Sequence, residues 1–246
     1  MFDGADQRLT IFLISQTPAK KLFSTNVLRW NSDYRDILFK NIGYVEAILE
    51  GSIWRMSNRL EKSIYEKMET HQSVETRRRK EGTATRLVWY RTAGVRYWIL
   101  FTNVGFGTES LSNKRAYFTS HEEACFYMAA FNSSLFWWYY ALNFDMFNLK
   151  DYMIFAFRLN YKADDRLVKL AKILDDDMRK NRQKQSVNRA TLGQGCTYTY
   201  RKKVSKPIID EIDEVLAKHY GFTEEELDFI INYDIKYRMG DELNEE

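Results

Sequence analysis

Apolar residues recur at helical spacing in two stretches of the chain. Leu60, Ile64 and Met68 are each four residues apart with charged residues between them, which is the pattern of a helix that buries one face. Residues 164–182 carry a similar apolar stripe and end in basic residues, which suit the negative end of a helix dipole. The pattern therefore predicts amphipathic helices over 57–68 and 164–182.

The C-terminal part shows two further helical stretches. The first opens at Pro207 and carries apolar residues at helical spacing, and the second covers 224–233 beyond a turn at Gly221. Thr223 with Glu226 is typical of a capping box, in which the hydroxyl and the carboxylate each satisfy a free backbone amide. We therefore expect a pair of helices at this end of the chain.

Aromatic residues are densest over residues 131–140. Upstream of them, Ser120 followed by Glu123 is a second capping-box pattern, so a helix should begin near His121. Residues 132–134, Asn-Ser-Ser, interrupt its apolar pattern with side chains that compete for backbone hydrogen bonds, which predicts a second cap or a kink. The aromatic residues themselves are expected to lie in a core helix.

Short apolar runs predict strands. Residues 8–15 are almost continuously apolar, which favours a strand buried on both faces. Such a strand needs neighbours, so we expect it to be the last strand of a sheet that lies mostly outside this chain, and the chain to be a fragment of a larger protein. Residues 87–91 and 95–101 are predicted to form a hairpin joined at Ala93-Gly94, and 152–159 a further strand.

The intervening polar stretches are predicted to be irregular. Residues 103–114 are typical of a loop and residues 183–195 of a turn-rich linker. Together these elements predict an α+β fold, with a small mixed sheet or hairpins, several helices and a C-terminal helical pair.

Composition narrows the class of protein. The chain has 246 residues, 45% of them hydrophobic, so it can bury a sizeable core. A net charge of +3 is too small to establish a nucleic-acid partner. Two cysteines and three scattered histidines give neither a disulfide framework nor metal-ligand spacing, which fits a reducing cytoplasm. The longest apolar run, over 135–142, is far shorter than the roughly 20 residues of a membrane span, so no membrane partner is expected.

Basic and aromatic residues alternate in two places. Residues 77–80 are Arg-Arg-Arg-Lys, and the predicted hairpin that follows adds arginines, tryptophans and tyrosines; residues 198–203 repeat the mixture. Cationic groups can neutralise phosphates or read guanine edges, while rings stack on bases or wedge between them. A solvated basic face whose rings lie in the core explains the same pattern equally well.

Several ordered segments resemble one family. The matching segments are 2–11, Arg29-Trp30, Arg91 with Tyr97-Trp98, 132–136, 212–217, 220–222 and 231–234. With these, the chain resembles the C-terminal part of bacterial adenine-specific DNA methyltransferases of the type IIG restriction-modification class, whose specificity domains are similar to the TaqI methyltransferase C-terminal domain. None of the segments is a catalytic signature.

The resemblance implies three segments with different roles. It makes residues 1–44 the end of a methyltransferase catalytic domain, residues 45–205 a target-recognition domain with a TaqI-like specificity fold, and residues 206–246 a C-terminal helical segment. Family members transfer a methyl group from S-adenosylmethionine with an Asn/Asp-Pro-Pro-aromatic tetrapeptide, whereas the only prolines here, Pro18 and Pro207, are not adjacent. We therefore expect no catalysis by this fragment and no cofactor in it. The parent enzyme would use S-adenosylmethionine, with magnesium as a further candidate cofactor, and a nuclease domain could accompany it.

The expected partners are double-stranded DNA and the methyltransferase catalytic domain of the parent chain. Candidate DNA-binding residues are Arg77, Arg78, Arg79, Lys80, Arg86, Trp89, Arg91, Arg96, Tyr97, Asn132, Ser133, Asn143, Arg201, Lys202 and Lys203. The alternative is a protein-interaction module that packs on another part of the enzyme without touching DNA. Exposed Trp137 and Trp138 side chains would favour that alternative, and their burial would count against it.

Overall fold

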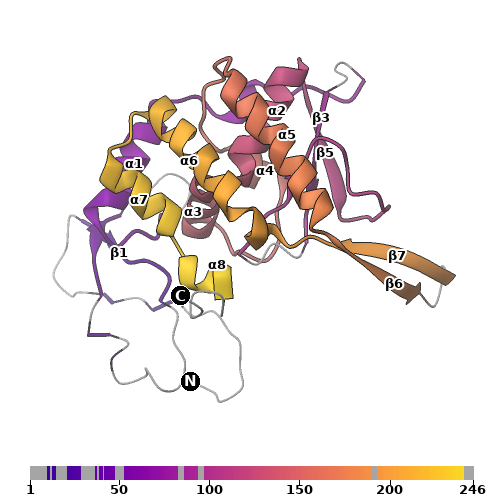
Figure 1. Cartoon of the computed structure of the whole chain (residues 1–246). Helices are drawn as coiled ribbons and strands as arrows, with labels where there is room; N and C mark the ends of the chain where they lie inside the picture. The colour runs from indigo at the N-terminus through magenta and orange to yellow at the C-terminus, as the bar shows by residue number, and fades with distance from the viewer. Residues whose placement is uncertain are drawn as a thin grey trace.

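The structure, a computed structural model, describes residues 10–11, 13–14, 21–28, 37, 39–40, 42–47, 53–82, 86–93, 97–189 and 193–240. This part is an α+β fold of helices and small antiparallel sheets (Figure 1). The α-helices are α1 (Arg59–Glu69), α2 (His121–Asn132), α3 (Ser134–Asn143), α4 (Asp151–Phe155), α5 (Asp165–Lys180), α6 (Lys206–Tyr220), α7 (Glu224–Asn232) and α8 (Ile235–Met239). The 3-10 turns are η2 (Val74–Thr76) and η3 (Lys202–Ser205).

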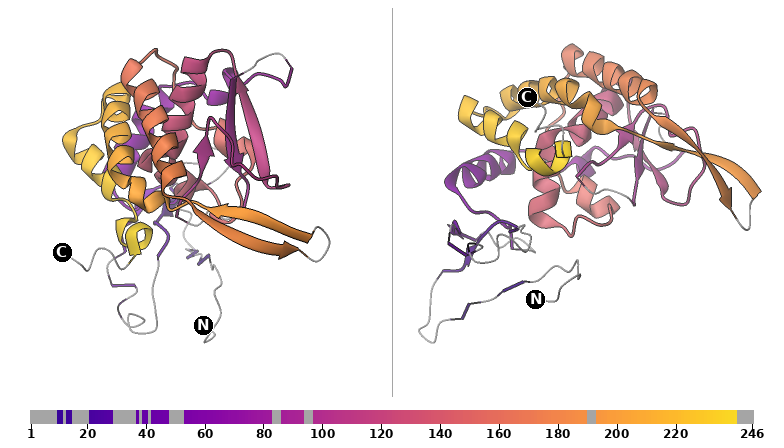
Figure 2. Two further views of the ribbon diagram at one scale, coloured as in Figure 1. Left: turned by 45° about the vertical axis from the view of Figure 1, so that its right-hand side comes forward. Right: turned by 60° about the horizontal axis from the view of Figure 1, so that its bottom comes forward.

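The strands form three separate antiparallel groups. They are β1 (Phe23–Ser24) with β2 (Val45–Glu46), β4 (Phe101–Thr102) with β3 (Arg86–Arg91) and β5 (Asn113–Phe118), and β6 (Gln183–Arg189) with β7 (Gly193–Thr199). In the central sheet β3 lies between β4 and β5 and pairs with β5 along its whole length. The β6–β7 hairpin projects away from the body of the molecule (Figures 1 and 2).

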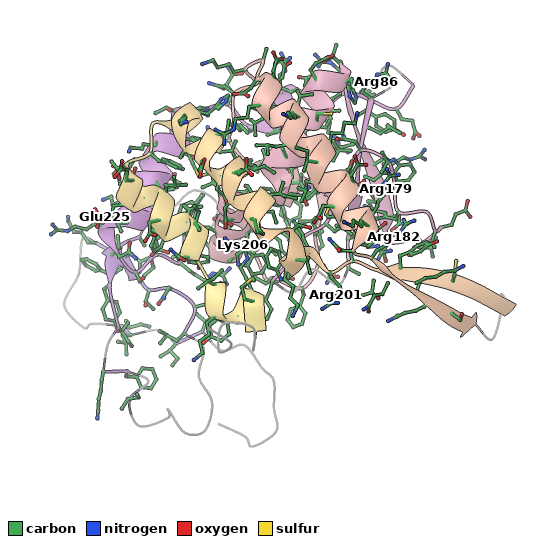
Figure 3. All side chains as sticks on the ribbon, viewed as in Figure 1. Arg86, Arg179, Arg182, Arg201, Lys206 and Glu225 are labelled. Atoms are coloured by element: carbon green, nitrogen blue, oxygen red, sulfur yellow. The ribbon has the colours of Figure 1, made fainter. Side chains whose placement is uncertain are left out.

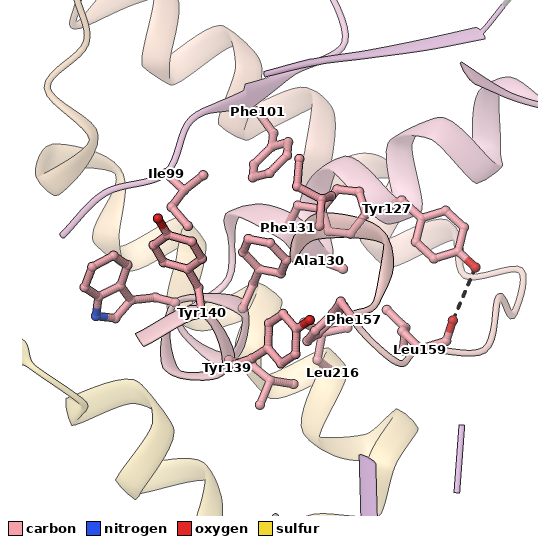
Figure 4. Packing of buried hydrophobic residues seen from close by; sticks show 14 of the residues in the cluster. Ile99, Phe101, Tyr127, Ala130, Phe131, Tyr139, Tyr140, Phe157, Leu159 and Leu216 are labelled. Atoms are coloured by element: carbon pink, nitrogen blue, oxygen red, sulfur yellow. Dashed lines mark hydrogen bonds between the residues drawn. The ribbon is translucent and has the colours of Figure 1, made fainter. Parts of the chain in front are cut away.

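The core is built around α2 and α3. Every residue from Glu123 to Leu142 is buried, and a helix that is apolar on all sides must be surrounded by other elements. Helix α2 contacts the central sheet through β3 and packs against α5 and α6, while α3 packs against α6 and α7. Rings from both helices interlock, as between Phe131 and Phe136, whose centres are 5.3 Å apart. Figure 4 shows Phe131 of α2 and Tyr139 of α3 among these packed rings.

Caps define the ends of these helices as their sequences predict. The Ser120 hydroxyl accepts the Glu123 amide at the start of α2, and the Glu123 carboxylate accepts the backbone N–H of Thr119 at 2.9 Å. The Ser133 hydroxyl accepts the Phe136 amide at 3.0 Å, so the predicted interruption is the cap of a new helix. Thr223 and Glu226 form the complete capping box of α7.

The helices predicted by apolar spacing are confirmed, including the one that buries Ile64 and Met68 and the one that buries Leu174. One hydrophobic core extends from Val45 to Ile230. It therefore continues across the boundary expected at residues 205 and 206.

One strand prediction is wrong and another stays open. The first half of residues 152–159 lies in the short helix α4, because an apolar run of this length fits a buried helix as well as a buried strand. In 8–15, the described residues belong to no strand, and Leu13 and Ile14 are 85% and 91% exposed. The prediction places the neighbours of this strand outside the chain, and residues 8, 9, 12 and 15 lie outside the described residues, so it stays a prediction.

The predicted hairpin of 87–91 and 95–101 is correct in its first strand. The second begins only at Phe101, which lies opposite Tyr90, and residues 94–96 fall outside the described part. The longer partner of β3 is β5, which begins inside the stretch predicted to be a loop. Only Ala116 and Phe118 of β5 are buried, so its sequence shows little apolar alternation. Residues 183–189 and 193–195, which belong to the predicted linker, lie in the paired strands of the β6–β7 hairpin instead.

Candidate nucleic-acid interface

The central sheet presents one face to the core and one outward. Val88, Tyr90, Ala116 and Phe118 are buried against α2 and its neighbours. Side chains alternate along a strand, so Trp89 and its neighbours at alternate positions of β3 and β5 lie on the outward face. The outward residues are Leu87, Trp89, Arg91, Arg115 and Tyr117, and each is partly or fully exposed.

Arg115 and Trp89 form the first arginine–aromatic pair on this face. They are opposite each other in the register of β3 and β5, and the guanidinium lies 5.2 Å from the centre of the indole ring. Gly105 packs against the same indole, since a Cβ at this position would lie 3.4 Å from the ring. The glycine, at φ +78°, thus brings the 103–112 loop onto the sheet.

Arg91 forms the second pair. Its guanidinium lies 4.9 Å from the ring centre of Phe106 and 5.9 Å from that of Tyr200. The Tyr200 hydroxyl donates a hydrogen bond of 3.3 Å to the Phe106 carbonyl, which holds the two rings together. Among the described residues, Arg91 has no carboxylate partner and its Nε has no acceptor.

Arg182 forms the third pair, at the foot of the projecting hairpin. Its guanidinium lies 3.9 Å from the ring centre of Tyr198 and donates to the Tyr200 hydroxyl at 3.4 Å. Gly107, at φ +70°, packs against both Arg182 and Tyr198, where a Cβ would stand 3.5 Å from each. The loop that contacts Trp89 therefore also contacts the hairpin.

These contacts join three elements into one surface, the arginine–aromatic face. It consists of Trp89, Arg91, Arg115, Arg182, Tyr198 and Tyr200, and the buried ring of Phe106 supports Arg91 from beneath. Arg86 and Arg201 add exposed cationic groups on the same side of the molecule, whereas Glu225 lies at the opposite side (Figure 3). Arg179 lies on this side too, but it is paired with Asp176 at 3.0 Å. A contact between a cation and a ring leaves the charge in place, so the face stays cationic.

Glu81 is a carboxylate at the edge of this face. It lies 3.5 Å from Arg115 and accepts a hydrogen bond from the Tyr117 hydroxyl. Burial and this hydrogen bond raise the pKa of the Tyr117 phenol above its ordinary value. Glu81 therefore offsets part of the charge of Arg115, while Arg91 and Arg182 keep theirs.

Of the four basic residues 77–80, two form ion pairs within the protein and two are exposed. Arg77 donates from Nε to the buried Glu123 carboxylate at 2.6 Å, and Arg78 contacts Asp151 at 2.7 Å. Both charges are thus largely matched within the protein. Arg79 and Lys80 are exposed, and Arg79 donates to the Thr119 hydroxyl at 3.1 Å.

Three of the predicted DNA contacts are buried and bonded within the protein. Asn132 bridges the backbone N–H and C=O of Phe101, at 3.2 and 3.0 Å, and Ser133 caps α3. Lys202 donates to the carbonyl of Ile99, and burial lowers the pKa of its ammonium well below the ordinary value. These side chains cannot reach a surface ligand, because the ends of α2 and α3 and the turn η3 that carry them are packed in the core.

The remaining predicted residues are scattered. Tyr97 packs on Tyr237 with near-parallel rings, and Lys203 is partly exposed. Asn143 lines a separate cavity of about 230 Å³ together with Trp54 and Tyr139. Arg96 lies outside the described residues.

Sequence reasoning missed Arg115 and Arg182 as parts of the surface, and Phe106 as the buried ring that supports Arg91. Arg115 belongs to a strand that the sequence did not predict, and Arg182 immediately precedes a hairpin that it assigned to a linker. Tyr198 and Tyr200 lie in the second basic-aromatic stretch, but they were not among the candidate residues. The alternation of outward and buried positions along β5 was the available signal.

No protein-family model, curated protein or solved structure matched the chain. In the part of the chain that the structure describes, no cluster of three or more His, Cys, Asp or Glu side chains is placed to hold a metal ion. Among the same residues, none of the helices combines the length and apolar character needed to cross a bilayer.

Proposed function

We propose that this chain is the target-recognition part of a cytoplasmic restriction-modification adenine-specific DNA methyltransferase, and that it binds double-stranded DNA through the arginine–aromatic face. The observation that carries the proposal is the surroundings of the Arg91 and Arg182 guanidinium groups. Each guanidinium is fixed against aromatic rings, and neither has a carboxylate partner among the described residues. Fixed cations of this kind suit a polyanion, because binding it orders them little further.

The chemistry of the face also suits DNA. Guanidinium groups donate several hydrogen bonds in one plane, which suits phosphate oxygens. The face spreads these groups along a sheet and the foot of a hairpin, so they can follow a phosphate backbone over several nucleotides. Positioning on phosphates is the first task of a recognition domain, before any base is read.

The proposed partner within the enzyme is the methyltransferase catalytic domain. Large apolar side chains are exposed along the N-terminal part of the described chain: Ile11, Leu13, Ile14, Leu22, Phe23, Ile37, Phe39, Tyr44 and Ile53. Exposed apolar surface of this density supports packing against another domain. The alternative of an interaction module built on the aromatic helix loses its support, because Trp137 and Trp138 are buried.

The test is a duplex-binding titration at several salt concentrations, read by fluorescence anisotropy. We expect the full chain to bind duplex DNA with an affinity that falls as salt rises. Arg91→Gln and Arg182→Gln should each weaken binding to every sequence and reduce the salt slope by about 0.9 for each phosphate that is no longer neutralised. Absence of binding at low salt, or unchanged slopes in both variants, would contradict the proposal.

Lys218→Gln is the matched control. Lys218 is exposed, but it lies near the end of α6, where Lys67 of α1 donates to the carbonyl of the following Gly221. Removing its charge changes the net charge by the same amount without touching the arginine–aromatic face. Its affinity and slope should equal those of the unmodified chain, and circular dichroism should show all three variants folded.

A further inference from the structure

A cavity of about 230 Å³ is bordered by the last turns of α1 and α3 and by α4. Four aromatic side chains line it, those of Trp54, Tyr139, Phe144 and Tyr152. The described residues that line it all lie outside the arginine–aromatic face. What the cavity binds is therefore independent of the proposed DNA binding.

Each ring of this aromatic wall stands at a steep angle to the next. The ring centres of Trp54 and Tyr139 are 6.0 Å apart, and the ring planes meet at 62°. The corresponding values are 5.7 Å and 75° for Tyr139 with Phe144, and 5.9 Å and 76° for Phe144 with Tyr152. A slot for a flat guest needs two roughly parallel ring faces that stack on it from both sides. Rings at steep angles instead contact a compact guest from several directions.

The inner part of the wall is fixed by the fold. Trp54 and Tyr139 are only 7% and 4% exposed. The Tyr139 hydroxyl donates to the Met153 carbonyl at 3.0 Å, and its ring packs on Phe157, with ring centres 5.1 Å apart (Figure 4). Tyr152 is 60% exposed and therefore marks the open side of the cavity. A guest would meet rings that are already in place, which lowers the cost of binding.

Among the described residues that line the cavity, the two with charged side chains form an ion pair. The Glu69 carboxylate lies 2.8 Å from Nε of Arg158. Nη1 of Arg158 also donates to the carbonyl of His71 at 3.2 Å. The pair therefore adds no net charge to the cavity. The aromatic rings, whose faces are partly negative, remain the main electrostatic feature that a guest meets.

We propose that this cavity binds a substituted ammonium group, such as a trimethylated amine. A cation over the face of an aromatic ring is attracted by the ring, most strongly by tryptophan, and aromatic cages recognise quaternary ammonium groups in this way. A trimethylammonium group is compact and rounded, so its methyl groups can contact rings set at different angles. Pockets for drug-sized ligands measure about 300–1,000 Å³, so this smaller cavity suits such a group with a short chain attached.

The test is calorimetric titration of the full chain with choline and with 3,3-dimethyl-1-butanol. The two probes have nearly the same shape, but the alcohol carries a neutral carbon in place of the charged nitrogen. We expect choline to bind about fivefold tighter or more, because only its charge is attracted by the ring faces. Equal affinities would reduce the cavity to an apolar pocket, and no measurable binding of choline would likewise contradict the proposal.

Two further probes identify the kind of guest. Adenine is flat and neutral and should bind more weakly than choline, whereas tighter binding of adenine would mean that the cavity takes flat rings instead. A peptide that contains trimethyllysine presents the same ammonium group on a protein side chain. Tighter binding of the peptide than of choline assigns the site to a modified protein, and the reverse order assigns it to a free small cation. Both orders support recognition of the ammonium group.

Tyr152→Leu removes an exposed ring from the cavity and keeps an apolar side chain there. It should weaken the binding of choline about threefold or more and leave that of the neutral alcohol nearly unchanged. Phe147→Leu changes a similarly exposed ring that does not line the cavity, so it is the matched control and should bind choline as the unmodified chain does. Equal weakening of both probes by Tyr152→Leu would contradict the assignment of a cation. Circular dichroism checks that both variants are folded, and their duplex binding should be unchanged.

Discussion

The carboxylate of Asp213 on α6 accepts hydrogen bonds from the backbone amide of Ser134 at the start of α3, at 3.0 and 3.1 Å. The amide of Leu135 donates to the same carboxylate at 3.2 Å, and Arg238 donates from Nη1 to the Ser134 hydroxyl at 2.9 Å. A carboxylate at a helix N-terminus is favoured by the free amides and by the helix dipole. This contact joins two helices that are far apart in the sequence.

Asp213→Ala should therefore lower the free energy of unfolding strongly. It leaves two buried amides without their acceptor and removes the negative charge that stabilises the buried Arg238 guanidinium. Removing one member of such a buried network costs about 3–5 kcal/mol. Urea denaturation followed by circular dichroism measures the change.

Glu225→Ala, on the exposed side of α7, is the control for this measurement and should change stability by less than about 0.5 kcal/mol. A loss for Asp213→Ala as small as that of the control would show that α3 does not depend on this cap.

Asp175 should make the stability of the protein depend on pH. Burial raises the pKa of its carboxyl to about 6, while in the unfolded chain the pKa is near 3.8. The native state therefore holds a proton that the unfolded state has released, and this stabilisation is present below about pH 4 and is lost as pH rises through 6. We expect the unmodified chain to lose about 3 kcal/mol between these limits relative to Asp175→Asn.

Urea denaturation of both proteins at several pH values between 4 and 7 measures this difference. Comparing them at each pH cancels the titration of all other groups. Glu225→Gln, which removes an exposed carboxylate of α7, should leave the pH dependence as it is in the unmodified chain. Parallel stability curves for the unmodified chain and Asp175→Asn would contradict the prediction.

Arg77 and Arg79 should behave differently although they belong to one basic run. Arg77→Ala leaves the buried Glu123 carboxylate without its ion-pair partner, and we expect a loss of roughly 1–3 kcal/mol, because the arginine itself is partly exposed. Arg79→Ala removes one exposed hydrogen bond and should cost less than about 1 kcal/mol. Thermal denaturation separates the two. Equal losses would mean that the Arg77 ion pair adds nothing to the fold.

The sequence predicted helices better than strands, and the reason is visible in particular elements. Helix α5 buries Leu167 and Leu174 on one face and starts at an Asp164 cap, so both its period and its start are local signals. Strand β5 is held by its pairing with β3, from which residues 92–112 separate it in the sequence. Nothing in the residues of β5 itself specifies that pairing. The sequences of β6 and β7 show no apolar alternation, so no local pattern marks them.

For the candidate site, too, the sequence predicted some residues correctly and others wrongly. Trp89 and Arg91 were predicted as parts of a basic-aromatic surface, and they lie on it. Asn132 and Lys202 were predicted beside them but are buried, because polarity alone does not tell a surface residue from a buried one whose bonds are satisfied.

By itself, the sequence determined the helices, their caps, the interruption at Ser133 and the burial of the aromatic stretch that follows it. These features depend on neighbours a few residues apart, within reach of local hydrogen bonds and of a single helix face. Only the tertiary structure decided which arginines share a surface. Arg91 and Arg115 come from two strands and Arg182 immediately precedes a third, and a strand acquires its neighbours through pairing between distant segments rather than through its own residues.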